Sequence, residues 1–187
     1  SREPRDRGCT THISVIDGQG MAVGLTTTPG ESAGFVVGDT GVILNNLLGE
    51  ADLHPQGFHT LAPGVRLSSM MSPTILLDGD RPLAVVGSGG SNRLRSAILQ
   101  AISNIVDFGL PVGRAVNQPR LHFEGQVIEL EAGYDPSAAE GLEQAGYRVN
   151  RWPERSMFFG GVHTAVRENG VWVGAGDPRR GGAARSP

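Results

Sequence analysis

Thr10 stands where the character of the sequence changes. The nine residues before it, SREPRDRGC, show no apolar periodicity, whereas THISVI after it alternates as a β-strand does. A threonine hydroxyl is a weak nucleophile, but a chain cut before Thr10 would free an α-amine, with an ordinary pKa of about 8, to act as its base. The pattern therefore fits an N-terminal nucleophile. On the bare sequence, β-branched residues that simply start a strand are the commoner explanation.

A second candidate is the pair Gly89 and Gly90, within GSGGS at 87–91. The pair lies between a strand pattern and a helix pattern, where backbone N–H groups can hold a phosphate or the oxyanion of a tetrahedral acyl intermediate. The lysine of a Walker motif is missing, which argues against nucleotide binding. A plain glycine turn is the alternative.

Other polar side chains carry weaker signals. Ser68 and Ser69, in RLSSMMSPT, either form a turn or offer hydroxyls to a carboxylate ligand. Cys9 is the only cysteine, so neither an internal disulfide nor a cysteine-based metal site can form. The acidic residues show no pair that the sequence places together. The histidines lack metal-ligand spacing and are predicted to be structural or on the surface: His12, His54, His59, His122 and His163.

The first half of the chain reads mainly as β-structure. Residues 10–28 form two strand patterns around the turn DGQG, which predicts a hairpin. A glycine-rich loop leads to a short apolar strand at 42–46, and a polar loop fills 49–67. Residues 73–87 predict a second hairpin with Asp-Gly at its turn.

The second half mixes helices with further strands. Apolar residues recur at helical spacing within 91–109, and a shorter helix is predicted at 112–118. Two short strands within 121–131 precede a capped helix at 135–146, and three strand-like runs follow it. The order predicts an α+β fold with two sheets sandwiched between helical layers.

Composition excludes several classes of protein. The 187 residues are enough for one domain, and no apolar run is long enough to span a bilayer. A formal net charge of −3 favours neither nucleic acid nor an acidic membrane surface as a partner. The first residues lack the apolar segment of a signal peptide, but the chain could be the C-terminal part of a longer, secreted precursor.

Six sequence blocks, taken in order, resemble a known family. They are spread over nearly the whole chain from Thr10 onward and are similar to the small, C-terminal subunit of γ-glutamyltranspeptidases. The resemblance implies an N-terminal-nucleophile hydrolase fold, a four-layer αββα sandwich completed by a large subunit of the same precursor that is not present in this chain. The blocks are TTHISVIDGQGMAV, TGVILNN, LSSMMSPTILL, GSGGSNR, NQPRLH and GAGDPRRGG.

The resemblance also implies roles for particular residues. Autocleavage between Cys9 and Thr10 would leave 1–9 as the remnant of the large subunit, 10–180 as the small catalytic subunit and 181–187 as a flexible tail. Thr10 would be the nucleophile, with Thr28 hydrogen-bonded to it and Gly89 and Gly90 forming the oxyanion hole. The reaction would be γ-glutamyl hydrolysis, or transfer to an amino acid or peptide, without a metal or organic cofactor. Members of the family are commonly periplasmic or secreted.

The substrate-binding residues depart from the family pattern. Glu50 falls near the acid that holds the substrate α-amine, but Leu47 occupies the place of a glutamine. One extra residue in SSMM leaves open whether Ser68, Ser69 or both reach the substrate carboxylate. A same-fold amidase, such as a β-lactam side-chain acylase or a poly-γ-glutamate depolymerase, is therefore an alternative. So is an unprocessed, non-catalytic paralogue that acts as a binding module.

Overall fold

The computed structural model describes residues 10–186, and its first element is the predicted hairpin. Strand β1 (Thr11–Ile16) pairs antiparallel with β2 (Ala22–Thr27). The side chain of Asp17 closes the turn by accepting hydrogen bonds from the backbone N–H groups of Gln19 and Met21. The hairpin predicted over 10–28 is therefore confirmed.

A four-stranded antiparallel sheet forms the centre of the molecule. Its strands are β3 (Thr74–Asp78), β4 (Arg81–Gly89), β8 (Gly161–Glu168) and β9 (Val171–Gly176), in the order β3-β4-β8-β9. The β3–β4 hairpin was predicted from its Asp-Gly turn and is confirmed. Strand β4 is central and carries a continuous buried run because both of its faces are covered.

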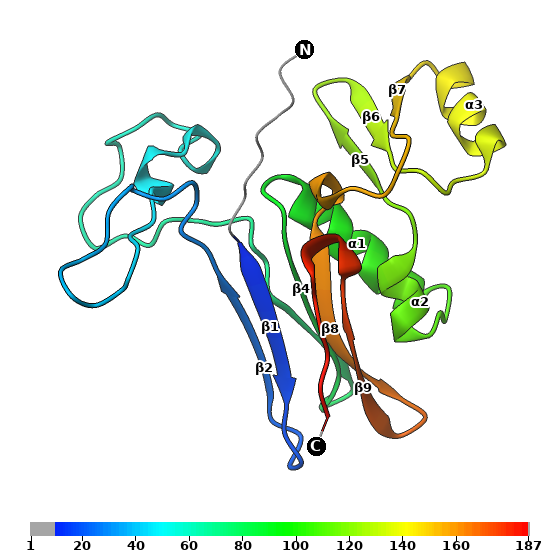
Figure 1. The fold of residues 1–187 in the computed structure, drawn as a ribbon, viewed down its shortest axis with the longest axis horizontal. Coiled ribbons are helices and arrows are strands. Elements are labelled where there is room, and N and C mark those ends of the chain that lie inside the picture. The colour runs from blue at the N-terminus through cyan, green and yellow to red at the C-terminus, as the bar shows by residue number, and fades with distance from the viewer. Residues whose placement is uncertain (1–9, 187) are drawn as a thin grey trace.

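Helices α1 (Arg93–Val106) and α2 (Val112–Asn117) cover one face of this sheet, while β1 and β2 lie against the other (Figure 1). Pro111 stands directly before α2, where the missing N–H is no loss. Both helices match their predicted positions within a few residues. The side chains that α1, α2, β4 and β8 bury between them form the core: Ala84, Val86, Leu94, Ala97, Ile98, Ala101, Val112, Val116, Val162 and Val166.

A smaller sheet packs beyond one end of α1. It contains β5 (Leu121–Glu124), β6 (Val127–Leu130) and β7 (Arg148–Arg151), with β6 and β7 parallel because α3 (Pro136–Gln144) connects them. Asp135 caps α3 by accepting from the N–H of Ser137, as the sequence of that segment predicted.

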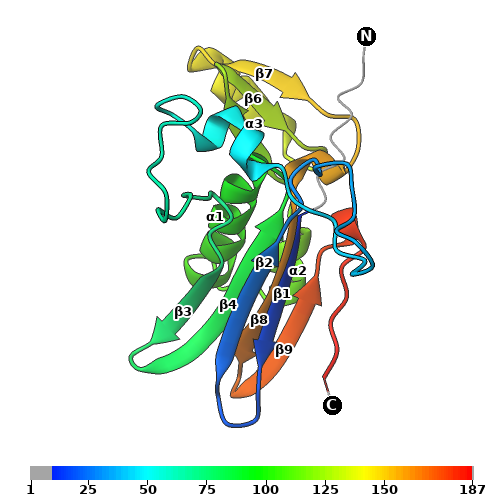
Figure 2. The ribbon, with the colours of Figure 1, turned by 90° about the vertical axis from the view of Figure 1, so that its left-hand side faces the viewer.

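The prediction of a strand at 42–46 is wrong. Only one isolated bridge forms there, between Val36 and Ile43, and both side chains are about half exposed. The segment therefore has no sheet to join within residues 10–186, and a strand needs a paired neighbour. It continues into two short 3₁₀ helices, Leu47–Gly49 and Ala51–Leu53, which lie near the end of β2 (Figure 2).

The described part of the chain thus has three stacked layers: the β1–β2 hairpin, the four-stranded sheet, and the helices α1 and α2. The outer face of the hairpin is apolar and exposed, with Ile13, Val15, Val23 and Leu25 each about half accessible to solvent. Among residues 10–186, no helix has the length and apolar character needed to cross a bilayer.

Candidate active site

The antiparallel register of the hairpin brings Thr10 and Thr28 together. Thr11 pairs with Thr27, so the residues just outside the two strands face each other. The Oγ of Thr10 donates a hydrogen bond of 2.9 Å to the Oγ of Thr28, which also accepts from the N–H of Gly30 at 2.9 Å. The hydroxyl of Thr10 is therefore held in one direction by a residue eighteen positions away in the chain.

Gly89 lies directly beside Thr10, and Gly90 follows it in the chain. A Cβ atom on Gly89 would overlap the carbonyl oxygen of Thr10, so no larger residue fits. Gly90 has a φ of +139°, and a Cβ there would lie 2.7 Å from the Cα of Gly160. The pair therefore needs to be glycine both for its conformation and for its close approach to the neighbouring backbone.

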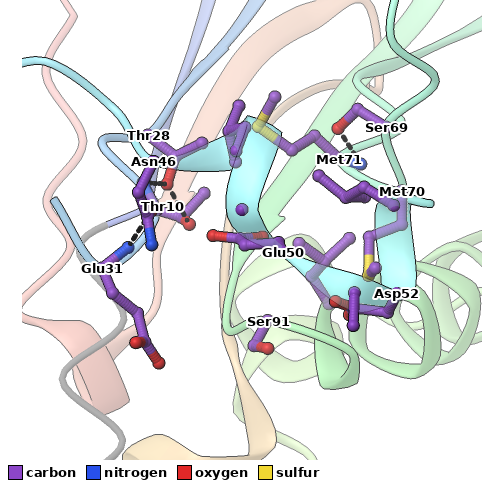
Figure 3. A pocket seen from close by; sticks show the side chains of 16 residues that line it. Thr10, Thr28, Glu31, Asn46, Glu50, Asp52, Ser69, Met70, Met71 and Ser91 are labelled. Carbon is purple, nitrogen blue, oxygen red and sulfur yellow. Dashed lines mark hydrogen bonds between the residues drawn. The ribbon is translucent and has the colours of Figure 1, made fainter. Parts of the chain in front are cut away.

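A cavity of about 520 Å³ opens beside the two threonines (Figure 3). One part of its wall is acidic and another is apolar, so it suits a ligand that has both a cationic and an apolar part. The polar lining side chains are Thr10, Thr28, Glu31, Asn46, Glu50, Asp52, Ser69 and Ser91. The apolar ones are Leu47, Ala51, Leu53, Met70, Met71 and Leu94.

Glu50 is an acid of this cavity whose pKa is raised. Burial raises the pKa of its carboxyl group, and the nearby carboxylates of Asp52 and Glu31 raise it further. A cation bound in the cavity would relieve this repulsion, which makes Glu50 a suitable partner for an ammonium group.

Because Gly30 has no side chain, Glu50 can lie close to the turn that follows Thr28. The φ of Gly30 is +63°, and a Cβ atom there would overlap the Oδ1 of Asn46 and the Oε1 of Glu50. The backbone N–H of Glu31 donates to the same Asn46 Oδ1 at 2.8 Å. The turn after Thr28 thus packs directly on Asn46 and Glu50, although the sequence separates these segments by more than fifteen residues.

The predicted serines separate in the structure. Ser69 lines the cavity, and its Oγ accepts a hydrogen bond of 3.2 Å from the N–H of Met71. Ser68 is exposed and is not among the residues that line the cavity. Both methionines of SSMM do line it, together with Leu47. Of the predicted site residues, Thr10, Thr28, Glu50, Ser69 and the glycine pair therefore come together, while Cys9 lies outside the described residues.

A cluster of buried charges behind the glycine pair was not predicted from the sequence. Arg120, Glu131, Asp177 and Arg179 are all at least 91% buried, and each arginine contacts both acids. The salt bridge from Arg120 to Asp177 measures 2.6 Å. The sequence places these residues in three separate segments, so only the ordered blocks NQPRLH and GAGDPRRGG could have drawn attention to them.

The charges in this cluster satisfy one another. Burial alone would raise the pKa of Asp177, but Arg120, the N–H of Arg179, the Arg179 guanidinium and the N–H of Val162 outweigh it and lower that pKa. Arg120 also donates to the carbonyl oxygens of Phe159 and Gly160 at 3.2 and 3.4 Å. Since Gly160 packs on Gly90, the cluster supports the glycine pair from behind.

Comparison with known proteins identifies the family of the chain. A model of the gamma-glutamyltranspeptidase family matches residues 1–186. The chain belongs to that family. This assignment confirms the resemblance inferred from the six sequence blocks.

Individual relatives show the range of the family. The chain is 34% identical over 189 residues to the glutathione hydrolase proenzyme of Bacillus subtilis (strain 168), covering 97% of this chain and 32% of the relative. It is also 34% identical over 169 residues to the acylase ACY 1 proenzyme of Pseudomonas sp. (strain SE83), covering 89% and 30%. The chain thus spans about a third of the length of these relatives.

The fold matches solved structures of the family as well. The gamma-glutamyltranspeptidase from Pseudomonas nitroreducens complexed with L-DON superposes with a TM-score of 0.77 at 25% identity. The match covers 95% of this chain and 99% of that chain. The mixed α+β architecture predicted from the sequence is therefore that of a family member.

Proposed function

We propose that this chain catalyses γ-glutamyl acyl transfer or hydrolysis through an ester on Thr10. The observation that carries the proposal is the 2.9 Å hydrogen bond from Thr10 to Thr28, made beside Gly89 and at the mouth of the cavity. The proposed nucleophile, the hydroxyl that orients it, a proposed oxyanion donor and space for a substrate are thus neighbours, and this arrangement supports acyl transfer.

The reaction has two steps. After cleavage of the Cys9–Thr10 bond, the Thr10 Oγ attacks the γ-amide carbonyl of glutathione or another γ-glutamyl compound, and the free Thr10 amine takes the hydroxyl proton. The N–H groups of Gly89 and Gly90 hold the oxyanion until the C–N bond breaks, and the leaving amine, cysteinylglycine for glutathione, receives the proton. Water or an acceptor amine then attacks the ester and releases Thr10.

Glu50 is the proposed contact for the substrate α-ammonium group. It lies against the turn that follows Thr28, and its carboxylate has two acidic neighbours that favour a bound cation. Ser69 is the proposed contact for the α-carboxylate, since its side chain lines the same cavity and the Ser68 side chain does not.

The proposal includes a partner from the same precursor. The chain spans about a third of its relatives, whose names describe proenzymes, and the exposed apolar face of β1 and β2 supports a missing layer. A large subunit would add this layer and complete a four-layer αββα sandwich. On this view 1–9 derive from the large subunit, 10–180 form the catalytic subunit and 181–187 are a tail.

Replacement of Thr10 in the full-length protein tests the proposal. Thr10→Ala removes the nucleophile, so both cleavage at Cys9–Thr10 and turnover of γ-glutamyl-p-nitroanilide are expected to disappear. Thr10→Ser keeps a hydroxyl and should retain part of each. Intact mass and N-terminal sequencing follow cleavage, and absorbance of released p-nitroaniline follows turnover. Full activity of the alanine variant would contradict the mechanism.

A second candidate function is hydrolysis of another amide by the same machinery. Leu47, Met70 and Met71 give the cavity an apolar wall, which favours acyl groups less polar than γ-glutamate. The similarity to the Pseudomonas acylase proenzyme agrees with this reading. A panel of γ-glutamyl and glutaryl amides separates the two, because activity on glutaryl amides alone would favour the acylase.

A non-catalytic binding module is the remaining alternative. It would keep the cavity but leave the Cys9–Thr10 bond whole, so that Thr10 has no free amine to act as a base. The hydrogen bond between Thr10 and Thr28 argues against it, because a binding module has no need for an oriented nucleophile. A wild-type protein that stays uncut under native conditions would favour this alternative.

A further inference from the structure

His12 lies on the inner face of β1, two residues after the proposed nucleophile. It is only 3% exposed, and its ring rests against the backbone of β4 at Gly87. A Cβ atom at Gly87 would overlap three atoms of the imidazole, so the ring occupies the space that a side chain there would need. At this position the hairpin therefore meets the central sheet through the His12 ring packed on Gly87.

Hydrogen bonds fix this ring at both nitrogens. The Nδ1 atom lies 2.7 Å from the Oγ of Thr26 on β2, and Nε2 lies 3.0 Å from the Oγ of Ser14. The Ser14 hydroxyl is also 3.1 Å from two carbonyl oxygens, those of Val85 on β4 and His163 on β8. Carbonyls only accept, so the single proton of Ser14 is directed to them.

The protonation of the ring follows from these contacts. Because the Ser14 proton is used on a carbonyl, its oxygen must accept from Nε2–H of His12. Nδ1 then carries no proton in the neutral ring and accepts from the hydroxyl of Thr26. A neutral His12 with its proton on Nε2 gives both ring nitrogens a partner, so these contacts specify one tautomer and one orientation of the neutral ring.

The same face of β1 contacts β4 at three successive alternate positions. Thr10 meets Gly89, His12 meets Gly87, and Ser14 meets Val85. The nucleophile and the proposed oxyanion donors are thus two residues away from the His12–Gly87 contact along each strand. The thickness of the imidazole therefore sets the separation of the two strands next to the reacting groups.

We propose that His12 is a positioning residue, whose ring sets the distance between Thr10 and the glycine pair through its contact with Gly87. The inference rests on the proposed function, since it takes Thr10 as the nucleophile and Gly89 and Gly90 as oxyanion donors. His12 itself takes no part in proton transfer, because its ring faces the sheet interior and both of its nitrogens are occupied.

The test compares His12 with a second buried histidine of the same chain. His122 is also 3% exposed and also contacts a serine hydroxyl, Ser96, at 2.8 Å, but it belongs to β5, in the smaller sheet, which pairs with neither β1 nor β4. In the full-length protein, His12→Ala is expected to lower kcat for γ-glutamyl-p-nitroanilide about 100-fold with KM within about threefold, because a misplacement of 1 Å costs about that much. His122→Ala should lose thermal stability while its kcat stays within about threefold.

Two further variants distinguish spacing from general damage. His12→Gln retains a side-chain N–H for Ser14 and is expected to recover at least tenfold over His12→Ala. Gly87→Ala places a methyl group in the ring and should be as inactive as His12→Ala or more so. The double variant His12→Ala with Gly87→Ala puts that methyl group into the vacated space, so it should exceed Gly87→Ala in kcat.

The outcomes separate this inference from the function on which it rests. If Thr10→Ala abolishes turnover but His12→Ala keeps the wild-type kcat, the positioning role is wrong and the acyl-transfer proposal stands. Equal losses of kcat in His12→Ala and His122→Ala would also overturn it, since they would show only the effect of lost stability. If Thr10→Ala itself retains activity, the proposed function has failed and not merely the role of His12.

Discussion

The β1–β2 hairpin buries its polar face and exposes its apolar face, which is the reverse of an ordinary sheet. Its inner face, packed on the central sheet, carries His12, Ser14 and Thr26, whereas its outer face carries Ile13 and Val15 and is about half exposed. In most two-layer proteins the apolar face is the buried one. The inner face therefore holds groups in place by hydrogen bonds, while the outer face is suited to being covered by another apolar layer.

The largest expected effect comes from breaking the inner contact at the nucleophile. In Gly89→Ala the added methyl group overlaps the Thr10 carbonyl oxygen, so β1 must move away from β4. We expect turnover of γ-glutamyl-p-nitroanilide to fall by about 10³-fold, as when an oxyanion donor is lost. Gly18→Ala, in the hairpin turn, is the matched control, because nothing lies within 4 Å of its added methyl group. Equal turnover by Gly89→Ala and Gly18→Ala would show that activity does not depend on the contact between Gly89 and Thr10.

The second prediction tests whether another layer covers the outer face of the hairpin. Ile13 is 49% exposed in this chain, but a large subunit would bury it. Ile13→Glu in the full-length protein would then bury an unpaired charge and cost about 3–5 kcal/mol of stability. Thermal melting and gel filtration measure this loss, with Ile13→Val as the control. An unchanged melting temperature for the glutamate variant would show that no layer covers this face.

A smaller effect follows from the pH dependence of the inner face. Burial, and to a lesser extent His163 on β8, lower the pKa of His12 from 6.5 to about 4. The unfolded state therefore binds more protons between these values, so the fold loses stability as the pH falls from 6.5 to 4. The loss attributable to His12 is about 3 kcal/mol, since one pKa unit corresponds to 1.36 kcal/mol.

The variant His12→Gln isolates this contribution. Its stability should fall less steeply than that of the wild type over the same pH range, because the other titrating groups remain in both proteins and only His163 loses its interaction with the His12 ring. Urea unfolding at pH 7 and pH 4.5 measures the difference. Parallel curves for the two proteins would show that His12 is not the titrating group.

Local patterns allowed most of the architecture to be predicted. The alternation of 11–16 and the turn after Ile16 determine the first hairpin, and the apolar spacing within 91–109 determines α1, because these signals lie within one element. The predicted strand at 42–46 failed for the opposite reason. Its apolar residues suit a strand, but a strand also needs a paired neighbour, and the local sequence does not specify which part of the chain provides it.

The residues of the site were also predicted only in part. Thr10 and the glycine pair lie within two of the six blocks, and Thr28 lies between the first and the second block, so the resemblance located them. The choice between Ser68 and Ser69 could not be made, since an extra residue shifts which side chain faces the cavity. The contact between His12 and Gly87 joins positions 75 residues apart, and no periodicity connects them.

The buried cluster of Arg120, Glu131, Asp177 and Arg179 has a consequence for how this sequence can vary. It contains two cations and two anions with almost no access to water, so replacing any one of them leaves an uncompensated charge in the interior. A single substitution at any of these four positions is therefore not neutral. Related sequences should either keep all four or exchange them in opposite-charge pairs, which makes the quartet a unit of coevolution.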